Sequence, residues 1–202
     1  MEAQADLELL PKEADALLRV AYGSIRHALA HRLPLPLTLA QFAPRLVAPG
    51  ACFVSLHHSG ELRGCIGTLV ADRALVEQVS HSACAAALRD WRFAPLAARE
   101  LAGLAVDVHV LGAFRALDFA APSALYAQLR PGVDGLVLEQ GDRQAVFLPA
   151  MWKDFPDPEE FVRRLLHKGG MPSWNGLRAR RFSAVELHAE AEPCLAAAPG
   201  GS

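Results

Sequence analysis

The sequence lacks several features that would assign it directly to a functional class. Among its 202 residues, no run of roughly eighteen apolar residues is free of charge and proline, which argues against a membrane-spanning helix. Its beginning, MEAQADLELLPKEAD, is acidic and has no apolar signal core. No GxGxxG, Walker loop or GxSxG elbow occurs, so nucleotide-dependent enzymes and serine hydrolases lack their signatures. We therefore expect a soluble cytoplasmic protein without a membrane anchor.

Cysteine is also scarce, and its spacing excludes two further classes of protein. The chain has four cysteines, Cys52, Cys65, Cys84 and Cys194. They show no CxxC spacing, so neither a zinc ribbon nor a dense disulfide framework is indicated, and we expect reduced thiols. Histidine pairs such as His27 and His31 supply at most two convergent ligands, fewer than a zinc site needs. No metal site is predicted, and no cofactor can be identified.

Charge of one sign is not in excess, but basic residues gather in one region. A net charge of -2 argues against a generally basic nucleic-acid-binding coat. Between Phe161 and Phe182, however, no acid interrupts the basic residues Arg163, Arg164, Lys168, Arg178, Arg180 and Arg181. The segment is typical of a solvated helix face followed by a strand with arginines on its wet side. Together with Trp174 it could instead form a binding face for RNA or a phosphate-bearing ligand.

The pattern of apolar residues predicts alternating helices and hairpins. In the first half, we expect a helix over residues 12–32, and strands over 51–57 and 61–69 that form a hairpin. A second helix is expected to begin at an Asp72 cap and to run to about Arg89. A strand over 104–112 follows, in which Asp107 and His109 share one face.

In the second half, a short helix over 123–129 precedes a hairpin that turns at Gly141 and Asp142. A helix capped by Asp157 is expected to end at Lys168, and residues 177–190 are expected to form one last strand. The prediction is an α+β fold, with a mostly antiparallel sheet and flanking helices. A single domain is expected over 8–192, followed by a flexible tail over 193–202.

The stretch LRGCIG, residues 62–67, places two glycines around a cysteine on the second arm of the first hairpin. Positions two apart share a strand face, so Arg63 would favour the thiolate form of Cys65. Gly64 and Gly67 would let a ligand or another backbone approach closely. The alternative is a bulge over a tight helix contact, with Cys65 as a small core residue.

Several motifs occur in the same order as in a known family. After LRGCIG come DWRF.PL..REL (residues 90–101), PG.DGL.L..G......LP (131–149) and FV..LLHKGGM...W (161–174). The chain therefore resembles the AMMECR family over roughly residues 10–190. The resemblance implies two lobes with a cleft between them that is lined by LRGCIG, and no established reaction. It also implies a place in the AmmeMemoRadiSam system, whose other members are a Memo-like protein and a radical SAM protein.

Other residues have two interpretations each. Asp90 and Arg92 belong to the second motif and could be ligand-binding residues, but an Asp and Arg at a helix end are often a structural ion pair. Lys168 could complement a helix dipole or bind an anion, and the resemblance favours the cleft. His109 could be a general base for Cys65 if their strands are neighbours, although a lone strand histidine is more often packing.

Two functions from different classes remain. The first is an enzyme or enzyme component that presents Cys65, with Arg63 and Lys168, to a small anionic substrate. The second is a non-catalytic module in which the basic segment and Trp174 bind RNA or a phosphate-bearing ligand.

Overall fold

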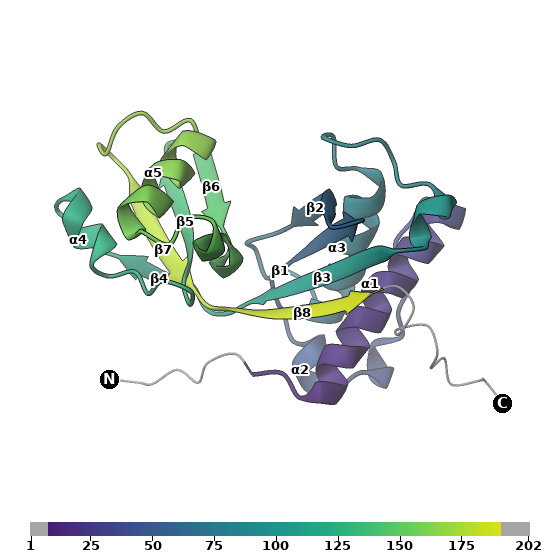
Figure 1. Ribbon diagram of the computed structural model, residues 1–202. Helices are drawn as coiled ribbons and strands as arrows, with labels where there is room; N and C mark the ends of the chain where they lie inside the picture. Colours follow the sequence, from purple (N-terminus) through teal and green to yellow (C-terminus); the bar gives the residue numbers. More distant parts are fainter. Residues whose placement is uncertain (1–7, 191–202) are drawn as a thin grey trace. The chain divides into compact units, whose positions relative to one another are not determined.

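A computed structural model describes residues 8–190, which form two compact units (Figure 1). The host unit comprises residues 8–111 and 185–190, and the inserted unit comprises residues 112–184. Each unit has its own four-stranded sheet with helices, so the predicted α+β class with antiparallel strands is confirmed, in two sheets instead of one. No helix within residues 8–190 has the length and apolar character that a bilayer crossing requires.

The host unit is built on β1 (Cys52–His58), β2 (Glu61–Gly67), β3 (Leu104–Leu111) and β8 (Ala184–Glu190). Their order in the sheet is β2-β1-β3-β8, and β1 is antiparallel to both β2 and β3. The predicted first hairpin is therefore present, and β2 lies at the edge of the sheet. This edge position leaves the outer backbone groups of β2 without a neighbouring strand.

Two long helices, α1 (Pro11–His31) and α3 (Leu75–Leu88), pack against each other and against this sheet. Strand alternation sends fully buried Val54 and Leu56 of β1, and Val108 of β3, towards the helices. The opposite face carries buried polar residues instead, among them Ser55 and Asp107. We call this face the polar face. Three short elements complete the unit: η1 (Leu39–Gln41), α2 (Pro44–Val47) and η2 (Ala98–Leu101).

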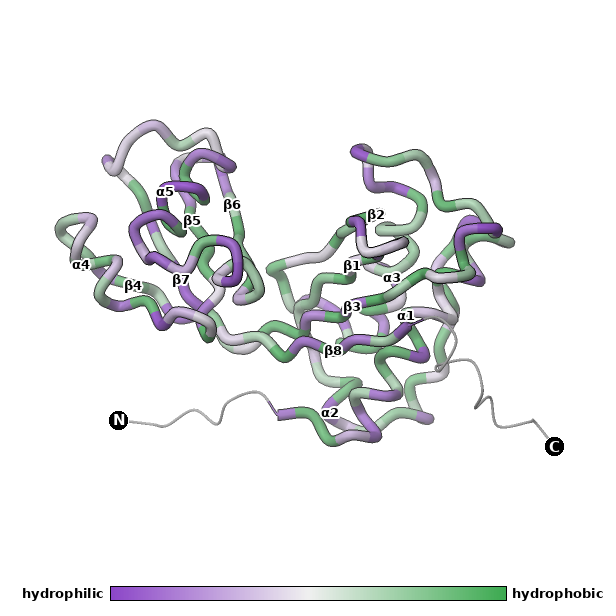
Figure 2. The backbone as a smooth tube through the Cα atoms, in the orientation of Figure 1, coloured by the Kyte–Doolittle hydropathy of each residue, from purple (hydrophilic) through white to green (hydrophobic). Residues whose placement is uncertain are grey.

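The inserted unit contains β4 (Arg115–Leu117), α4 (Pro122–Tyr126), β5 (Gly135–Gln140), β6 (Arg143–Phe147), η3 (Pro149–Lys153), α5 (Pro158–Lys168) and β7 (Arg178–Phe182). Its antiparallel sheet has the order β4-β7-β5-β6. The tube of α5 is largely hydrophilic in Figure 2, yet the helix buries one stripe that includes Phe161, Val162 and Leu165. Trp152 stacks on Phe161, with ring centroids 3.8 Å apart.

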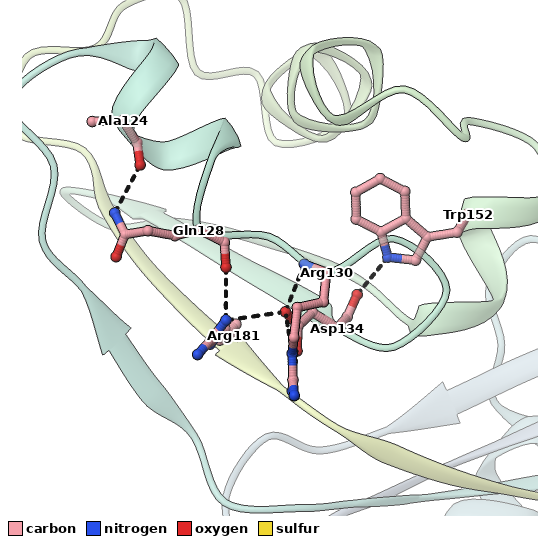
Figure 3. Close-up of polar contacts among 6 residues, drawn as sticks. All are labelled: Ala124, Gln128, Arg130, Asp134, Trp152 and Arg181. Carbon is pink, nitrogen blue, oxygen red and sulfur yellow. Dashed lines mark hydrogen bonds and ion pairs between the residues drawn. The ribbon is translucent and has the colours of Figure 1, made fainter. Parts of the chain in front are cut away.

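A buried carboxylate holds the inserted unit together (Figure 3). Asp134 is completely buried, and its carboxylate accepts hydrogen bonds from Arg130 at 2.7 Å and from Arg181 at 3.4 Å. The Trp152 indole donates to the Asp134 carbonyl at 2.6 Å. An unpaired buried charge has a high desolvation free energy, so Asp134 can be buried here because the two arginines bind its carboxylate. The PG.DGL motif is thus the junction between β5, β7 and η3.

Three local expectations have clear outcomes. Asp157 caps α5 as predicted, because its carboxylate accepts from the Glu160 backbone at 2.9 Å. The expectation that Asp72 caps α3 is wrong: a bridge between Pro49 and Ala74 keeps the chain extended until Leu75.

The single last strand is also wrong, because it is divided at Ser183 between the two sheets. There the Ser183 carbonyl accepts from Gly112 at 2.8 Å, where the chain enters and leaves the inserted unit. The predicted tail, with Cys194, lies outside the described residues.

Gly64 lets the backbone of β2 lie against α3, which generates a stability prediction. A Cβ at Gly64 would lie 2.3 Å from the Ala86 carbonyl oxygen, which is backbone and cannot move aside. Gly64→Ala should therefore lower the free energy of unfolding by about 1–3 kcal/mol, measured by urea denaturation.

Gly23→Ala is the matched control, because its Cβ would meet only the flexible Leu35 side chain at 3.3 Å. Alanine is favoured over glycine inside a helix by about 0.5–1 kcal/mol, so this variant should be at least as stable as the parent protein. Equal stability of Gly64→Ala and the parent would contradict the tight contact.

Candidate functional site

Cys65 lies on β2 and differs from the other cysteines of the described residues. Cys52 and Cys84 are buried in the host unit, and Cys65 is only partly buried. Burial raises the pKa of Cys52 to about 12, against the opposing effect of its hydrogen bond with Ser82, and burial also raises the pKa of Cys84. Both buried thiols are therefore protonated at neutral pH. Among the cysteines within residues 8–190, Cys65 is therefore the one whose thiol a reagent can approach.

The backbone of Cys65 is held by two side chains from the loop after α3. Its N–H donates to the Asp90 carboxylate at 2.8 Å, and its carbonyl accepts from the Arg92 guanidinium at 3.2 Å. Asp90 and Arg92 also bind each other at 2.6 Å. The expected ion pair is therefore present, and it additionally satisfies the outer edge of β2 where a neighbouring strand would otherwise bind.

Asp90 is strongly stabilised in its ionised form. Its pKa falls to about 2, chiefly because the Arg92 guanidinium binds the carboxylate; burial opposes the shift, and backbone N–H donors assist it. The pKa of Arg92 is raised in turn, mainly by Asp90, with a smaller contribution from Cys65. Arg92 is therefore a cation that interacts with Cys65.

Arg63, the cation expected beside Cys65, is engaged elsewhere. The pairing of β1 with β2 shifts register between Leu56 and His57, so the rule of alternating faces does not hold across Arg63. The Arg63 guanidinium binds both oxygens of Glu100 in η2, at 2.7 and 3.1 Å. This pairing lowers the pKa of Glu100 to about 2. Arg63 thus compensates the charge of Glu100.

A row of polar side chains crosses the polar face from Cys65. In the strand register, Ser55 of β1 is the partner of both Cys65 and Asp107. The Ser55 hydroxyl donates to the Cys65 sulfur at 3.2 Å. The Asp107 carboxylate is hydrogen-bonded to Nδ1 of His188 at 2.6 Å, and its other oxygen lies 2.9 Å from Nδ1 of His57, within ion-pair distance.

His109 does not lie next to Cys65, because β1 separates β3 from β2. His109 was considered as the base for Cys65 only if their strands were neighbours, and this condition is not met. The register partner of His109 is Phe53 on β1. His57, which the sequence did not single out, lies two residues from Ser55 on β1. The alternation S-L-H in residues 55–57 is the signal that could have indicated it, but only with the strand register known. In the described part of the chain, no group of three or more ligand-type side chains is arranged to hold a metal ion.

The two glycines of LRGCIG accommodate the protein itself. Gly64 faces the Ala86 carbonyl, and a Cβ at Gly67 would lie 2.4 Å from both the Cys52 carbonyl oxygen and the Phe53 ring. Of the two explanations that the sequence left open, the tight helix contact is present at Gly64, beside the register shift between Leu56 and His57. Cys65 itself is only partly buried, so it is not the core residue of that explanation.

The basic segment belongs to the inserted unit and is largely paired with acids. Lys168 donates to the Val146 carbonyl at 2.9 Å and lies over the Phe147 ring. Arg163 and Arg164 bind Glu160, Arg178 and Arg180 bind Glu139, and Arg181 binds Asp134. Trp174 packs edge-on against Phe119 and Tyr126. That Lys168 and Cys65 share a cleft stays a prediction.

Comparison with known proteins agrees with this architecture. The sequence pattern of the AMMECR1 family matches residues 18–187. A protein of Methanosarcina barkeri is 32% identical over 187 residues, which cover 90% of this chain and 92% of that relative. The crystal structure of an uncharacterized protein from Pyrococcus horikoshii is similar with a TM-score of 0.84 and 26% identity, covering 90% of this chain and 94% of the other.

Shorter matches are found in other archaea. A protein of Thermofilum pendens is 37% identical over 138 residues, which cover 66% of this chain and 64% of the relative. A protein of Methanothermobacter thermautotrophicus is 36% identical over 121 residues, which cover 59% of this chain and 63% of the relative. The matched region thus spans slightly less than two thirds of each of these two relatives.

The lowered pKa of Asp90 predicts how stability depends on pH. The folded value, about 2, lies below the ordinary value of 3.8, so ionised Asp90 stabilises the fold above about pH 4. This stabilisation is lost as the pH falls from about 4 to about 2. Asp90→Asn should remove about 1–2 kcal/mol at pH 7, allowing for solvent screening at Arg92, and little at pH 2.

The measurement is urea denaturation of both proteins between pH 2 and 7. Glu100 titrates in both, so the difference between the two curves isolates Asp90. A difference that stays constant over this range would show that the carboxylate charge is not what stabilises the loop.

Proposed function

The chain belongs to the AMMECR1 family, and from this premise we propose that it is an enzyme or enzyme component whose reactive group is the Cys65 thiol. One observation supports the proposal above others. Cys65 is the most exposed cysteine within residues 8–190, and Asp90 and Arg92 bind its backbone N–H and carbonyl groups. These bonds satisfy the edge of β2, and they also hold Cys65 in one position, which a nucleophile requires.

Each neighbour of the sulfur has a chemical role in this proposal. The positive charge of Arg92 favours the thiolate, which is the nucleophilic form, and can also attract an anionic substrate. Asp90 holds Arg92 in place. Ser55 donates to the sulfur and stabilises negative charge on it. The substrate class that fits is a small molecule with an anionic group and an electrophilic centre.

The proposed partners are a Memo-like protein and a radical SAM protein. Their support is the family resemblance, because the names of the three relatives described above state no substrate or reaction. In this arrangement, Cys65 would act on a substrate or an intermediate that a partner supplies.

The alternative, an RNA-binding module, is not favoured. Nucleic-acid affinity depends on cations that can neutralise phosphates, and the arginines of the basic segment are already paired with Glu139, Glu160 and Asp134. Trp174 makes edge-on contacts with Phe119 and Tyr126 of its own unit, so it has a packing role there.

Selective alkylation tests the proposal. In the folded protein, iodoacetamide should modify Cys65 well before Cys52 or Cys84, as followed by mass spectrometry of the labelled peptides. Arg92→Gln should slow Cys65 labelling at pH 7 by up to about tenfold, because it removes the nearby positive charge. Arg63→Gln is the matched control and should have a smaller effect, since Arg63 is bound to Glu100.

A Cys65 that resists labelling in the folded protein, and reacts only after unfolding, would instead indicate a structural thiol. Salt-sensitive binding to RNA together with that result would support the binding module.

A further inference from the structure

We propose that His57, oriented by Asp107, is the general base that accepts the proton of the Cys65 thiol. This inference rests on the proposed function, because it assigns the group that activates the same sulfur. It replaces His109 with a residue that the strand register brings near Cys65. The inference is carried by the register of three strands and by the contacts of the Asp107 carboxylate with two histidines.

The register places His57 on the polar face, diagonal to Cys65. Ser55 pairs with Cys65, and His57 is two residues further along the same strand. Diagonal residues on adjacent antiparallel strands are about 7–8 Å apart, which long side chains can span. The ion-pair contact between His57 and Asp107 is independent evidence that this imidazole lies on the polar face, despite the bulge at Arg63.

Asp107 decides which ring nitrogen of His57 can act as a base. Nδ1 lies 2.9 Å from the Asp107 carboxylate, which can only accept a hydrogen bond, and in this proposal the proton of the neutral ring is therefore on Nδ1. The lone pair is then on Nε2. Among residues 8–190, the structure gives His57 Nε2 no hydrogen bond, and the side chain is 31% exposed. An acid that orients histidine in this way also stabilises the imidazolium formed when the base takes a proton.

The proposed step is a single proton transfer. The proton on the Cys65 sulfur moves to His57 Nε2. The Ser55 hydroxyl, which donates to the sulfur, stabilises the thiolate that remains. The products are a thiolate and an imidazolium. With iodoacetamide as the electrophile, the sulfur–carbon bond then forms as the carbon–iodine bond breaks and iodide leaves. The proton stays on His57 until solvent removes it.

The charged and titratable groups around this step come from four other elements and from the loop after α3. They are Cys65 and Arg63 on β2, Asp107 on β3, His188 on β8, Glu100 in η2, and Asp90 and Arg92 after α3. Glu100 with Arg63, and Asp90 with Arg92, are ion pairs, and of the two arginines Arg92 is the one that also contacts Cys65. Asp107 is the acid that binds His57 directly.

His188 provides a matched control on the same carboxylate. It binds the other oxygen of Asp107 at 2.6 Å, but it comes from β8, and both β1 and β3 lie between β8 and β2. If His57 is the base, replacing it should affect Cys65 much more than replacing His188. If Asp107 and its histidines only stabilise the fold, the two replacements should have similar effects.

The experiment measures the rate of Cys65 alkylation by iodoacetamide between pH 5.5 and 9 in the parent protein, His57→Gln and His188→Gln. A general base typically contributes about 10²–10⁴-fold, and a conservative expectation for this simple reaction is a loss of about tenfold at pH 7 in His57→Gln. The rates should converge near pH 9, where hydroxide in solution generates thiolate without the base. His188→Gln should change the rate at pH 7 by less than about twofold.

A second measurement on the parent protein does not depend on the stability of a variant. Nitrogen NMR of the histidine rings should show neutral His57 with its proton on Nδ1. A proton on Nε2 would overturn the inference, as would equal rates at pH 7 in the parent and His57→Gln, or equal losses in both variants. In each of these cases Cys65 can still be the most reactive thiol, whereas failure of the proposed function would appear as an unreactive Cys65 in the parent protein.

Discussion

The backbone contact between β2 and α3 at Gly64 is the constraint on which the site depends. With no side chain at Gly64, the strand lies directly against the Ala86 carbonyl, and the next residue, Cys65, faces the opposite side of the sheet. The same close approach brings the end of α3 to the edge of β2. The chain leaving α3 therefore delivers Asp90 and Arg92 to the outer backbone groups of Cys65. The contact at Gly64 thus determines both the packing of β2 on α3 and the position of Asp90 and Arg92 beside Cys65.

The host sheet separates two kinds of environment. Its helix-covered face is apolar, and hydrophobic burial there stabilises the unit. Its polar face buries Ser55 and Asp107. Burial of the Asp107 carboxylate is compensated because it contacts the imidazoles of two histidines. One of them, His188, is on β8, which follows the inserted unit in sequence. The polar network thus also helps to fasten the returning strand to the host sheet.

Arginine has a structural role in both units. Asp134 is buried with Arg130 and Arg181, and Glu139 accepts from Arg180, so the sheet of the inserted unit uses guanidinium groups to bring acids inside. Arg92, like Arg130, pairs with a buried acid while its own side chain stays partly exposed, at 41%. What distinguishes Arg92 is its contact with Cys65. A guanidinium in that position can bind a carboxylate and still face solvent beside a thiol.

The sequence by itself determined the α+β class, the two hairpins, the cap of α5 and the choice of Cys65 as the thiol to examine, because these depend on local periodicity, turn residues and spacing. The side chains that surround Cys65 could not be predicted in this way. Arg63 was expected beside it from regular alternation, but the strand register shifts at this point and Arg63 binds Glu100 instead. The glycines allowed a bulge to be considered, but they did not show where the register would shift. His109 was considered and His57 was not, since strand order and register are set by contacts between residues far apart in the chain. Only the tertiary structure decided which side chains share the polar face, because hydrogen bonding between strands, and not spacing along one strand, brings Cys65, Ser55 and Asp107 into one row.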